Sequence, residues 1–146
     1  MSEESNQTMF FKTLLENSNN DDIKLAIDEW SYVYSFLEPA HCICGMPIRE
    51  NCVIKNKYNG ICLVVGNKCV NKFMKIDKEF IFKGIRSLLK NTIPNKEFIN
   101  YCYEKEYLYE NQKDFLLDRY RKRKHTPKQQ EFIDKLLFKL KLKNKY

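Results

Sequence analysis

The apolar positions near the start of the chain follow a helical period. Over residues 21–37 they recur at the i, i+3, i+4 and i+7 spacing of a helix that packs on one face. Asp21 and Asp22 suit the N-terminus of such a helix, and Pro39 is expected to end it. Residues 1–20 are polar and acidic, with enough apolar side chains for one short amphipathic turn. The pattern therefore predicts a first helix over residues 21–37 behind an acidic head.

The period changes to two in the middle of the chain. Cys52 and Ile54 alternate with polar neighbours, and an apolar run follows at residues 61–65. The Asn59-Gly60 pair between these segments is typical of a tight hairpin turn. Two short antiparallel strands are therefore predicted, and this hairpin is the only sheet that the pattern supports.

The remainder of the chain has the period of packed helices. The last helix has the clearest start, because Thr126 is a predicted N-cap, Pro127 takes the first helical position and Gln129 completes a capping box. An interruption at residues 107–110 is the alternative to one continuous helix before it. Four helices are predicted in this part. The first begins near Lys68, the second covers residues 78–89, the third covers residues 95–124 and the fourth begins at Pro127.

The composition favours one compact domain without a membrane segment. The chain has 146 residues, of which 43% are hydrophobic, and no apolar run approaches the roughly 18 residues that a membrane span requires. The N-terminal sequence lacks the charged-then-apolar layout of a signal peptide. Four glycines and four prolines exclude Gly-rich phosphate loops and low-complexity architecture. We therefore expect an intracellular protein without a membrane partner.

Charge is distributed unevenly along the chain. The net charge is +7, but residues 1–38 carry 2 basic and 8 acidic side chains (−6), residues 39–118 carry 13 and 9 (+4), and residues 119–146 carry 11 and 2 (+9). A basic end of this kind is typical of proteins that contact a polyanion, although a solvated corner between two helices is the alternative. The candidates for contact with nucleic-acid phosphates are Arg119, Arg121, Lys122, Arg123, Lys124 and Lys128.

Five of the six cysteines lie between Cys42 and Cys69, which predicts a metal site. In a chain without a secretion signal, clustered cysteines favour metal binding over disulfides, and four thiolate or imidazole ligands suit a structural Zn²⁺. The turn from Cys42 through Cys44 to Gly45 suits backbone N–H groups that point at the thiolates. Cys69 is expected on the first turn of a helix, where the helix dipole lowers the pKa of a thiol.

The identity of the fourth zinc ligand has several candidates. Cys52 is the preferred one, and His41 and Cys62 are the alternatives. Cys102, alone in a predicted helix, is expected to be a buried core residue. The predicted set of zinc ligands is therefore Cys42, Cys44, Cys52 and Cys69.

The sequence contains no recognisable catalytic set. His41 and His125 are the two histidines, and neither lies near a nucleophile and an aspartate in the pattern of a hydrolase triad. A zinc ion with four protein ligands also has no open position for a water molecule. We therefore expect a binding protein and not an enzyme.

Together these patterns predict an α+β fold, with a zinc-stabilised knuckle and β-hairpin flanked by mostly helical N- and C-terminal segments. The expected boundaries are an acidic polar head at 1–20, a single zinc-stabilised domain at 21–140 and a basic tail at 141–146. Within the domain, the zinc core covers 41–74 and the helical C-terminal part covers 78–140.

Two motifs give the chain a resemblance to a known group of proteins. The first is the CICG sequence that starts at Cys42, and the second is the VGNKCVNKF sequence that starts at Val65. With these motifs the chain resembles, over residues 21–140, a family of small, largely uncharacterised zinc-binding proteins of bacteriophages, large DNA viruses and some bacteria. The resemblance implies an intracellular, zinc-stabilised α+β module, located in the cytoplasm or nucleus of the host cell if the protein is viral. It implies no particular reaction.

Two classes of function agree with these observations. The first is a zinc-binding accessory protein that contacts nucleic acid through its basic C-terminal helical region, largely independently of sequence. The alternative is a zinc-stabilised adaptor for protein–protein contacts in viral or phage replication or transcription machinery. Binding to DNA that weakens steeply with salt would separate the two classes.

Overall fold

The computed structural model describes residues 3–144 and divides into two compact units, Met1–Lys78 (unit 1) and Glu79–Tyr146 (unit 2). Helices and one three-stranded antiparallel sheet are present, and a group of cysteines lies beside the hairpin. The predicted α+β class is therefore confirmed. The grouping of residues 21–140 into a single domain stays a prediction, and each unit is described by itself.

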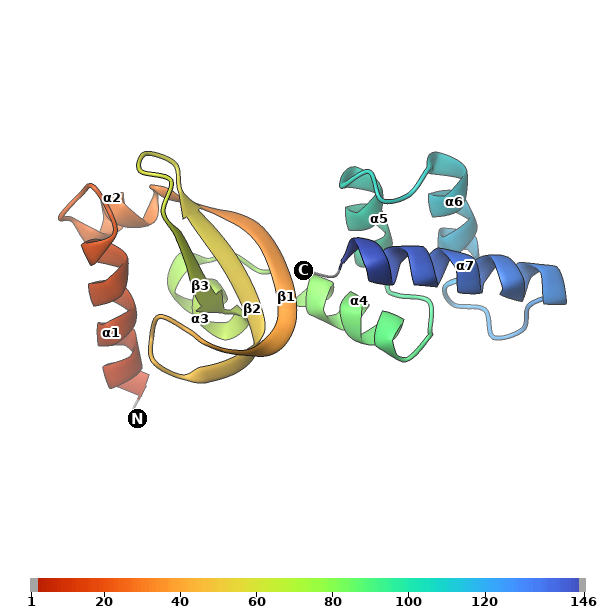
Figure 1. Cartoon of the computed structure of the whole chain (residues 1–146), viewed down its shortest axis with the longest axis horizontal. Coiled ribbons are helices and arrows are strands. Elements are labelled where there is room, and N and C mark those ends of the chain that lie inside the picture. The colour runs from red at the N-terminus through yellow and green to blue at the C-terminus, as the bar shows by residue number, and fades with distance from the viewer. Residues whose placement is uncertain (1–2, 145–146) are drawn as a thin grey trace. The chain divides into compact units, whose positions relative to one another are not determined.

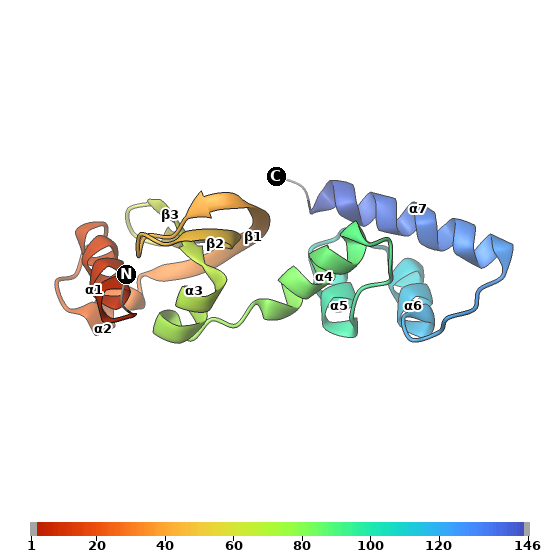
Figure 2. The same cartoon turned by 90° about the horizontal axis from the view of Figure 1, so that it is seen from below.

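Unit 1 combines the sheet with three helices (Figure 1). Helix α3 lies across one face of the sheet, as the view in Figure 2 shows. Helix α1 packs on α3 through Phe10 and Phe11, whose ring centroids lie 4.9 and 5.3 Å from that of Phe73. The elements of unit 1 are α1 (Glu3–Glu16), α2 (Ile23–Ile27), β1 (Trp30–His41), β2 (Pro47–Asn56), β3 (Cys62–Gly66) and α3 (Asn67–Met74).

The acidic head contains a longer helix than the short turn predicted for it. Helix α1 has 14 residues, and its side chains at Phe10 and Leu14 are fully buried. These two positions are four residues apart, so they lie on the same face of the helix. Burial of this face stabilises a helix whose polar composition gives a weak signal in the sequence. Residues 1 and 2 of the predicted head lie outside the described residues.

The predicted helix over residues 21–37 is wrong for most of its length. Only α2 is helical there, and the chain from Trp30 onward forms strand β1. Aromatic side chains alternate with other residues from Trp30 to Phe36, a pattern that suits a strand as well as a helix, and pairing with β2 selects the strand. Pro39 lies inside β1 and does not end a helix. The strand tolerates it because β1 is at the sheet edge and its register shifts between Leu37 and Ala40.

The predicted hairpin is confirmed as strands β2 and β3. Cys52 pairs with Val65 and Ile54 pairs with Leu63 in the antiparallel register. The turn contains Gly60 with a positive φ of 75°, a backbone conformation that glycine adopts without strain. The sheet order is β1-β2-β3, so the hairpin is only part of the sheet.

A buried carboxylate joins the start of β1 to the segment that follows α1. Glu29 is buried, and its carboxylate accepts hydrogen bonds from the backbone N–H groups of Asn19 at 2.7 Å and Asn20 at 2.9 Å. The side-chain amide of Asn56, at the end of β2, donates a further hydrogen bond at 2.9 Å. Burial raises the pKa of the Glu29 carboxyl, but these hydrogen bonds outweigh it and lower the pKa to about 2.

Glu29→Gln is therefore expected to reduce the stability of unit 1 most strongly near neutral pH. A lowered pKa contributes stability above the ordinary pKa of 4.5, and this contribution is lost as the pH falls towards about 2. The difference in unfolding free energy between the native protein and the variant should shrink over that interval. Urea unfolding of both proteins at several pH values measures this difference in unfolding free energy. A difference that stays constant between pH 4.5 and 2 would contradict this role of the carboxylate.

Unit 2 consists of helices. The long helix predicted before residue 124 is interrupted, as the alternative prediction had it, and the interruption extends from Lys105 to Tyr109. The capping box at the last helix is confirmed, because the Gln129 N–H donates to Thr126 Oγ1 at 3.1 Å and the Thr126 N–H donates to Gln129 Oε1 at 2.9 Å. The helices of unit 2 are α4 (Glu79–Leu89), α5 (Lys96–Glu104), α6 (Glu110–Arg119) and α7 (Pro127–Lys143).

Helix α7 includes the first part of the predicted basic tail. Residues 141–143 are helical, and residues 145 and 146 lie outside the described residues. The apolar side chains of α7 at Ile133, Leu136, Leu137 and Leu140 are buried in unit 2. Cys102 on α5 is also fully buried, as expected of a core cysteine. Within residues 3–144, no helix combines the length and the apolar character needed to cross a membrane.

Gly84 on α4 allows the close approach of α5. A Cβ at this position would overlap the ring of the fully buried Phe98. Gly84→Ala is therefore expected to destabilise unit 2 by about 1–3 kcal/mol, although the same change in an exposed helix would add about 1 kcal/mol of stability. Denaturant unfolding measures whether Gly84→Ala lowers or raises the free energy of unfolding. In the background of Phe98→Leu, which makes room, the cost of Gly84→Ala should fall, and an unchanged cost would contradict the steric explanation.

Candidate metal centre and basic segment

A tight turn between β1 and β2 places two of the cysteines. The Cys42 N–H donates to the Met46 carbonyl at 3.0 Å, and the Gly45 N–H donates to the Cys42 carbonyl at 2.9 Å. Gly45 has a φ of 94°, which closes the turn and favours glycine. The turn buries Cys42 and Cys44 with 4% and 1% of their surface exposed. The CxCG motif therefore forms the compact knuckle that its sequence predicts.

The third cysteine reaches the knuckle from the first turn of α3, which begins directly after β3. Gly66 is the residue before the helix, and it permits this approach. A Cβ at Gly66 would lie 3.3 Å from Cγ2 of Ile48 and 3.9 Å from Cβ of Cys42. The end of β3 therefore lies against the knuckle, and Cys69 follows three residues later. The predicted helix start near Lys68 is confirmed by α3.

The three sulfur atoms of Cys42, Cys44 and Cys69 lie within 4.8 Å of one another. The Sγ atoms of Cys69 and Cys44 are 3.7 Å apart. Zinc–sulfur bonds of about 2.3 Å in a tetrahedron place neighbouring sulfur atoms about 3.8 Å apart, so the spacing fits a shared ion. It is too long for a disulfide, in which the two sulfur atoms are about 2.05 Å apart. The arrangement can hold a metal ion that prefers thiolates.

The thiols of this cluster differ in acidity. The hydrogen bond from Cys69 lowers the pKa of Cys42 to about 6 against the effect of burial, and backbone N–H groups of Cys44 and Gly66 contribute. Burial raises the pKa of Cys44, and the hydrogen bond to Cys42 raises that of Cys69. Among the three thiols, Cys42 is therefore the one whose pKa is lowered. Binding of a metal ion must displace the protons of the other two thiols, so metal affinity falls as the pH is lowered.

The structure does not bring the other predicted ligands into this cluster. Cys52 is fully buried, with its Sγ 3.5 Å from Oγ of Ser35, and burial raises its pKa to about 11. Cys62 is exposed at the far end of β3, and four steps along the extended strand, about 13 Å, separate its backbone from that of Gly66. His41 is exposed beside Cys42. Only Cys42, Cys44 and Cys69 are therefore grouped among the described residues.

Cys52→Ser is expected to reduce zinc affinity less than Cys44→Ser or Cys69→Ser. The reason is geometric, because the Cys52 side chain faces Ser35 in the core and lies outside the group of three sulfur atoms. Competition with a chromophoric chelator measures the affinities of the three variants side by side. If Cys52→Ser loses zinc as completely as the other two, Cys52 is the fourth ligand.

A cavity beside the cluster contains groups that the sequence did not single out. Its volume is about 320 Å³, and Cys44, Cys69, Glu50 and Asn67 are among the residues that line it. The side-chain amide of Asn67 donates to Oε1 of Glu50 at 3.4 Å. Asn67 lies within the VGNKCVNKF motif but is not one of the predicted ligands, and Glu50 belongs to neither motif, so only the fold reveals that the two side chains meet beside the cysteines.

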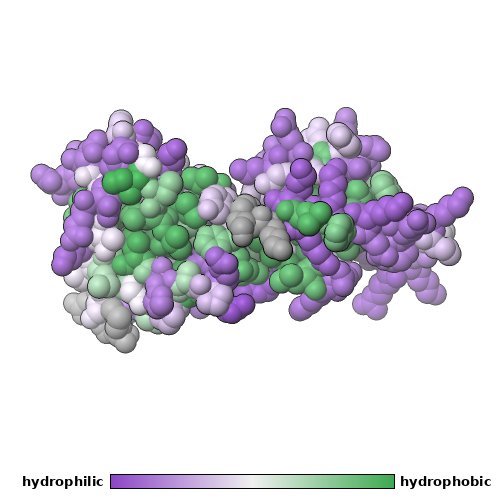
Figure 3. Space-filling model, in the orientation of Figure 1, coloured by the Kyte–Doolittle hydropathy of each residue, from purple (hydrophilic) through white to green (hydrophobic). Residues whose placement is uncertain are grey.

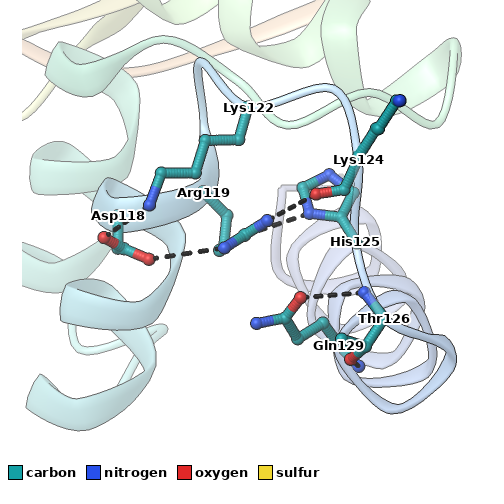
Figure 4. A network of polar contacts seen from close by, with 7 residues as sticks. All are labelled: Asp118, Arg119, Lys122, Lys124, His125, Thr126 and Gln129. Carbon is teal, nitrogen blue, oxygen red and sulfur yellow. Dashed lines mark hydrogen bonds and ion pairs between the residues drawn. The ribbon is translucent and has the colours of Figure 1, made fainter.

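The basic segment of residues 119–128 joins the end of α6 to the start of α7. The side chain of Arg119 turns inward, as Figure 4 shows, with Nε donating to Nδ1 of His125 at 3.0 Å and Nη2 donating to the Lys124 carbonyl at 2.6 Å. Asp118 lies 3.8 Å from Arg119 and forms a closer ion pair with Lys122, at 3.2 Å. Arg119 thus holds the loop together, which a run of charges in a sequence does not reveal.

The other predicted nucleic-acid contacts are exposed side chains of the same segment, namely Arg121, Lys122, Arg123, Lys124 and Lys128. Figure 3 shows hydrophilic residues covering the end of unit 2 at which α7 begins. Such a surface is accessible to a polyanion. Comparison of the chain with protein-family models, with curated proteins and with solved structures gives no match.

Proposed function

We propose that this chain is a zinc-binding protein that contacts nucleic acid through the basic end of unit 2. The observation that carries the zinc part is the group of three sulfur atoms within 4.8 Å of one another. Thiolates suit Zn²⁺, and the 3.7 Å between Cys44 and Cys69 fits tetrahedral zinc. Bound zinc would cross-link the knuckle to α3. Its role is structural, and the resemblance to zinc-binding viral and phage proteins is part of the same proposal.

Zinc has a clear structural task in unit 1. The unit has 78 residues, and domains of this size bury too little apolar surface to be strongly stable. The knuckle and α3 lie at the two ends of the β2–β3 hairpin, and a metal ion held by both would fix their positions. The free energy of metal binding then becomes free energy of folding. A binding protein with a structural ion, rather than an enzyme, is therefore proposed.

The basic segment supports the nucleic-acid part of the proposal. Residues 119–146 carry a net charge of +9, and five of the six predicted contact residues in the segment are exposed. Arg119 is the exception and holds the loop. Lysine and arginine side chains of this kind bind phosphates and release counterions, which gives salt-sensitive and largely sequence-independent affinity. The proposed partner is thus nucleic acid of mixed sequence.

A protein–protein adaptor is the second candidate. Phe138 and Leu142 are 63% and 57% exposed, and they lie four residues apart on α7. Two large apolar side chains on one helix face favour contact with another protein. The same helix provides basic side chains, so the two candidates are distinguished by binding measurements and not by location.

Metal analysis together with a gel-shift titration tests the proposal. Purified protein is expected to contain about one Zn²⁺ per chain, as structural zinc centres do. Four phosphate contacts would weaken binding to random-sequence DNA about 100-fold between roughly 50 and 200 mM salt. Metal-free protein of native stability would overturn the zinc part. An absence of DNA binding at roughly 50 mM salt would overturn the nucleic-acid part and leave the adaptor.

A further inference from the structure

A cavity of about 250 Å³ in unit 2 is lined mainly by polar side chains, with Ile93 and Ile133 as its aliphatic residues. It lies between the α4–α5 loop and the basic segment with the first turns of α7. No aspartate or glutamate is among its lining residues in the described part of the chain. The residues that determine its chemistry are Lys122, Arg123, His125, Asn91, Thr92 and Gln130. The lining of the cavity thus combines two cationic side chains with several uncharged hydrogen-bonding groups.

The loop that forms one wall is held in position by its own contacts. Arg119 donates to Nδ1 of His125 and to the Lys124 carbonyl, and these bonds connect the two ends of the loop (Figure 4). Because Nδ1 of His125 accepts a hydrogen bond, Nε2 carries the proton of the neutral ring. His125 is one of the lining residues, and the N–H of its neutral ring is thus the free hydrogen-bond donor of that side chain. The capping box at Thr126 fixes the direction of α7 directly after it.

The opposite wall is also ordered by hydrogen bonds. Thr92 Oγ1 donates to the Ser87 carbonyl at 3.1 Å at the end of α4. The Asn91 side-chain oxygen accepts a hydrogen bond from Nζ of Lys141 on α7. A third cation therefore lies next to the cavity wall, and it comes from a different element than Lys122 and Arg123. Positive charge converges on this cavity from two directions.

We propose that this cavity binds a phosphate group of the nucleic acid, an inference that rests on the proposed function. Two cations and an N–H donor around a site without carboxylates match the charge and the acceptor oxygens of a phosphate. The Lys122–Asp118 ion pair is exposed, so it is weak and a phosphate can compete for the lysine. A cavity below the roughly 300 Å³ of ordinary small-molecule sites suits a phosphate and its sugar. The phosphate can belong to a strand end or to the backbone.

Two double variants distinguish a specific phosphate site from general electrostatic attraction between the basic segment and nucleic acid. Lys122→Ala with Arg123→Ala removes the charges that line the cavity, while Arg121→Ala with Lys124→Ala removes the same charge from the same loop outside it. The probe is a random-sequence single-stranded oligonucleotide with either a phosphate or a hydroxyl at its 5′ end. The cavity variant is expected to bind about tenfold more weakly than its control, because charge-assisted hydrogen bonds are lost in addition to charge.

The two probes identify the source of the phosphate. Tighter binding of the 5′-phosphorylated strand, lost in the cavity variant, assigns the site to a strand end, and equal binding of both strands assigns it to the backbone. His125→Asn tests the site without a change of charge, since asparagine keeps an acceptor for Arg119 and removes the Nε2 donor. It should weaken binding several-fold with an unchanged melting temperature.

Equal loss of affinity in the two double variants would overturn the phosphate site and leave the proposed function intact. Failure of the native protein to bind either strand would overturn both. Circular dichroism of each variant shows whether unit 2 remains folded, and the control pair provides the reference for any general effect of the loop.

Discussion

Cys69→Ser and Cys44→Ser are each expected to release zinc and to unfold most of unit 1. Cys69 comes from α3 and Cys44 from the knuckle, so either change disconnects the two segments that the ion would join. Structural zinc contributes about 10–16 kcal/mol in small zinc-binding peptides at neutral pH, more than the whole stability of many domains. Elemental analysis measures the zinc, and circular dichroism and urea unfolding measure the loss of structure.

Cys62→Ser and Cys102→Ser are the matched controls for these variants. Cys62 is exposed on β3 and Cys102 is buried in unit 2, and both lie outside the cluster. Both should keep the native zinc content when purified under the same reducing conditions. Full zinc occupancy in Cys69→Ser and Cys44→Ser would mean that these sulfur atoms do not hold the ion.

The second large effect is expected from neutralising the exposed part of the basic segment. Arg121, Arg123, Lys124 and Lys128, changed together to glutamine, remove four charges from exposed positions. The slope of log affinity against log salt should decrease by up to about four, because each lost phosphate contact releases about one counterion less. Fluorescence anisotropy with random-sequence DNA at a series of salt concentrations measures the slope.

Four exposed lysines of unit 1 provide the control with the same change of charge. They are Lys12, Lys24, Lys55 and Lys57. Their replacement by glutamine should change the salt slope much less, since they lie outside the basic segment. Zinc content and melting temperature should hardly move in either variant, as exposed charges usually alter stability by about 0.5 kcal/mol. Equal slopes for both variants would show that only the total charge matters.

Local signals in the sequence predict the parts of the fold that depend on neighbouring residues. The Asn59-Gly60 turn determines the hairpin, and Thr126, Pro127 and Gln129 determine the start of α7. The three cysteines that come together were identified by the CxCG turn and by the helix start after Gly66. Each of these features stabilises itself over a few residues, so the sequence alone is enough to find it.

Features that depend on distant parts of the chain were not predictable in this way. The apolar residues from Trp30 to Phe36 fit a helical spacing and a strand spacing equally, and pairing with β2 decides between them. Cys52 has the right residue type for a ligand, but its partner Val65 in the register places it in the core. Arg119 is one of several arginines in its run, and only the position of His125 turns it inward.

X-ray absorption spectroscopy at the zinc edge tests the central claim most directly. It counts the sulfur atoms bound to the metal and measures their distances in the intact, zinc-loaded protein. The cluster of Cys42, Cys44 and Cys69 predicts at least three sulfur ligands at about 2.3 Å, with two or fewer remaining in Cys69→Ser. A spectrum dominated by nitrogen and oxygen ligands, unchanged by Cys69→Ser, would contradict a zinc centre built from these three cysteines.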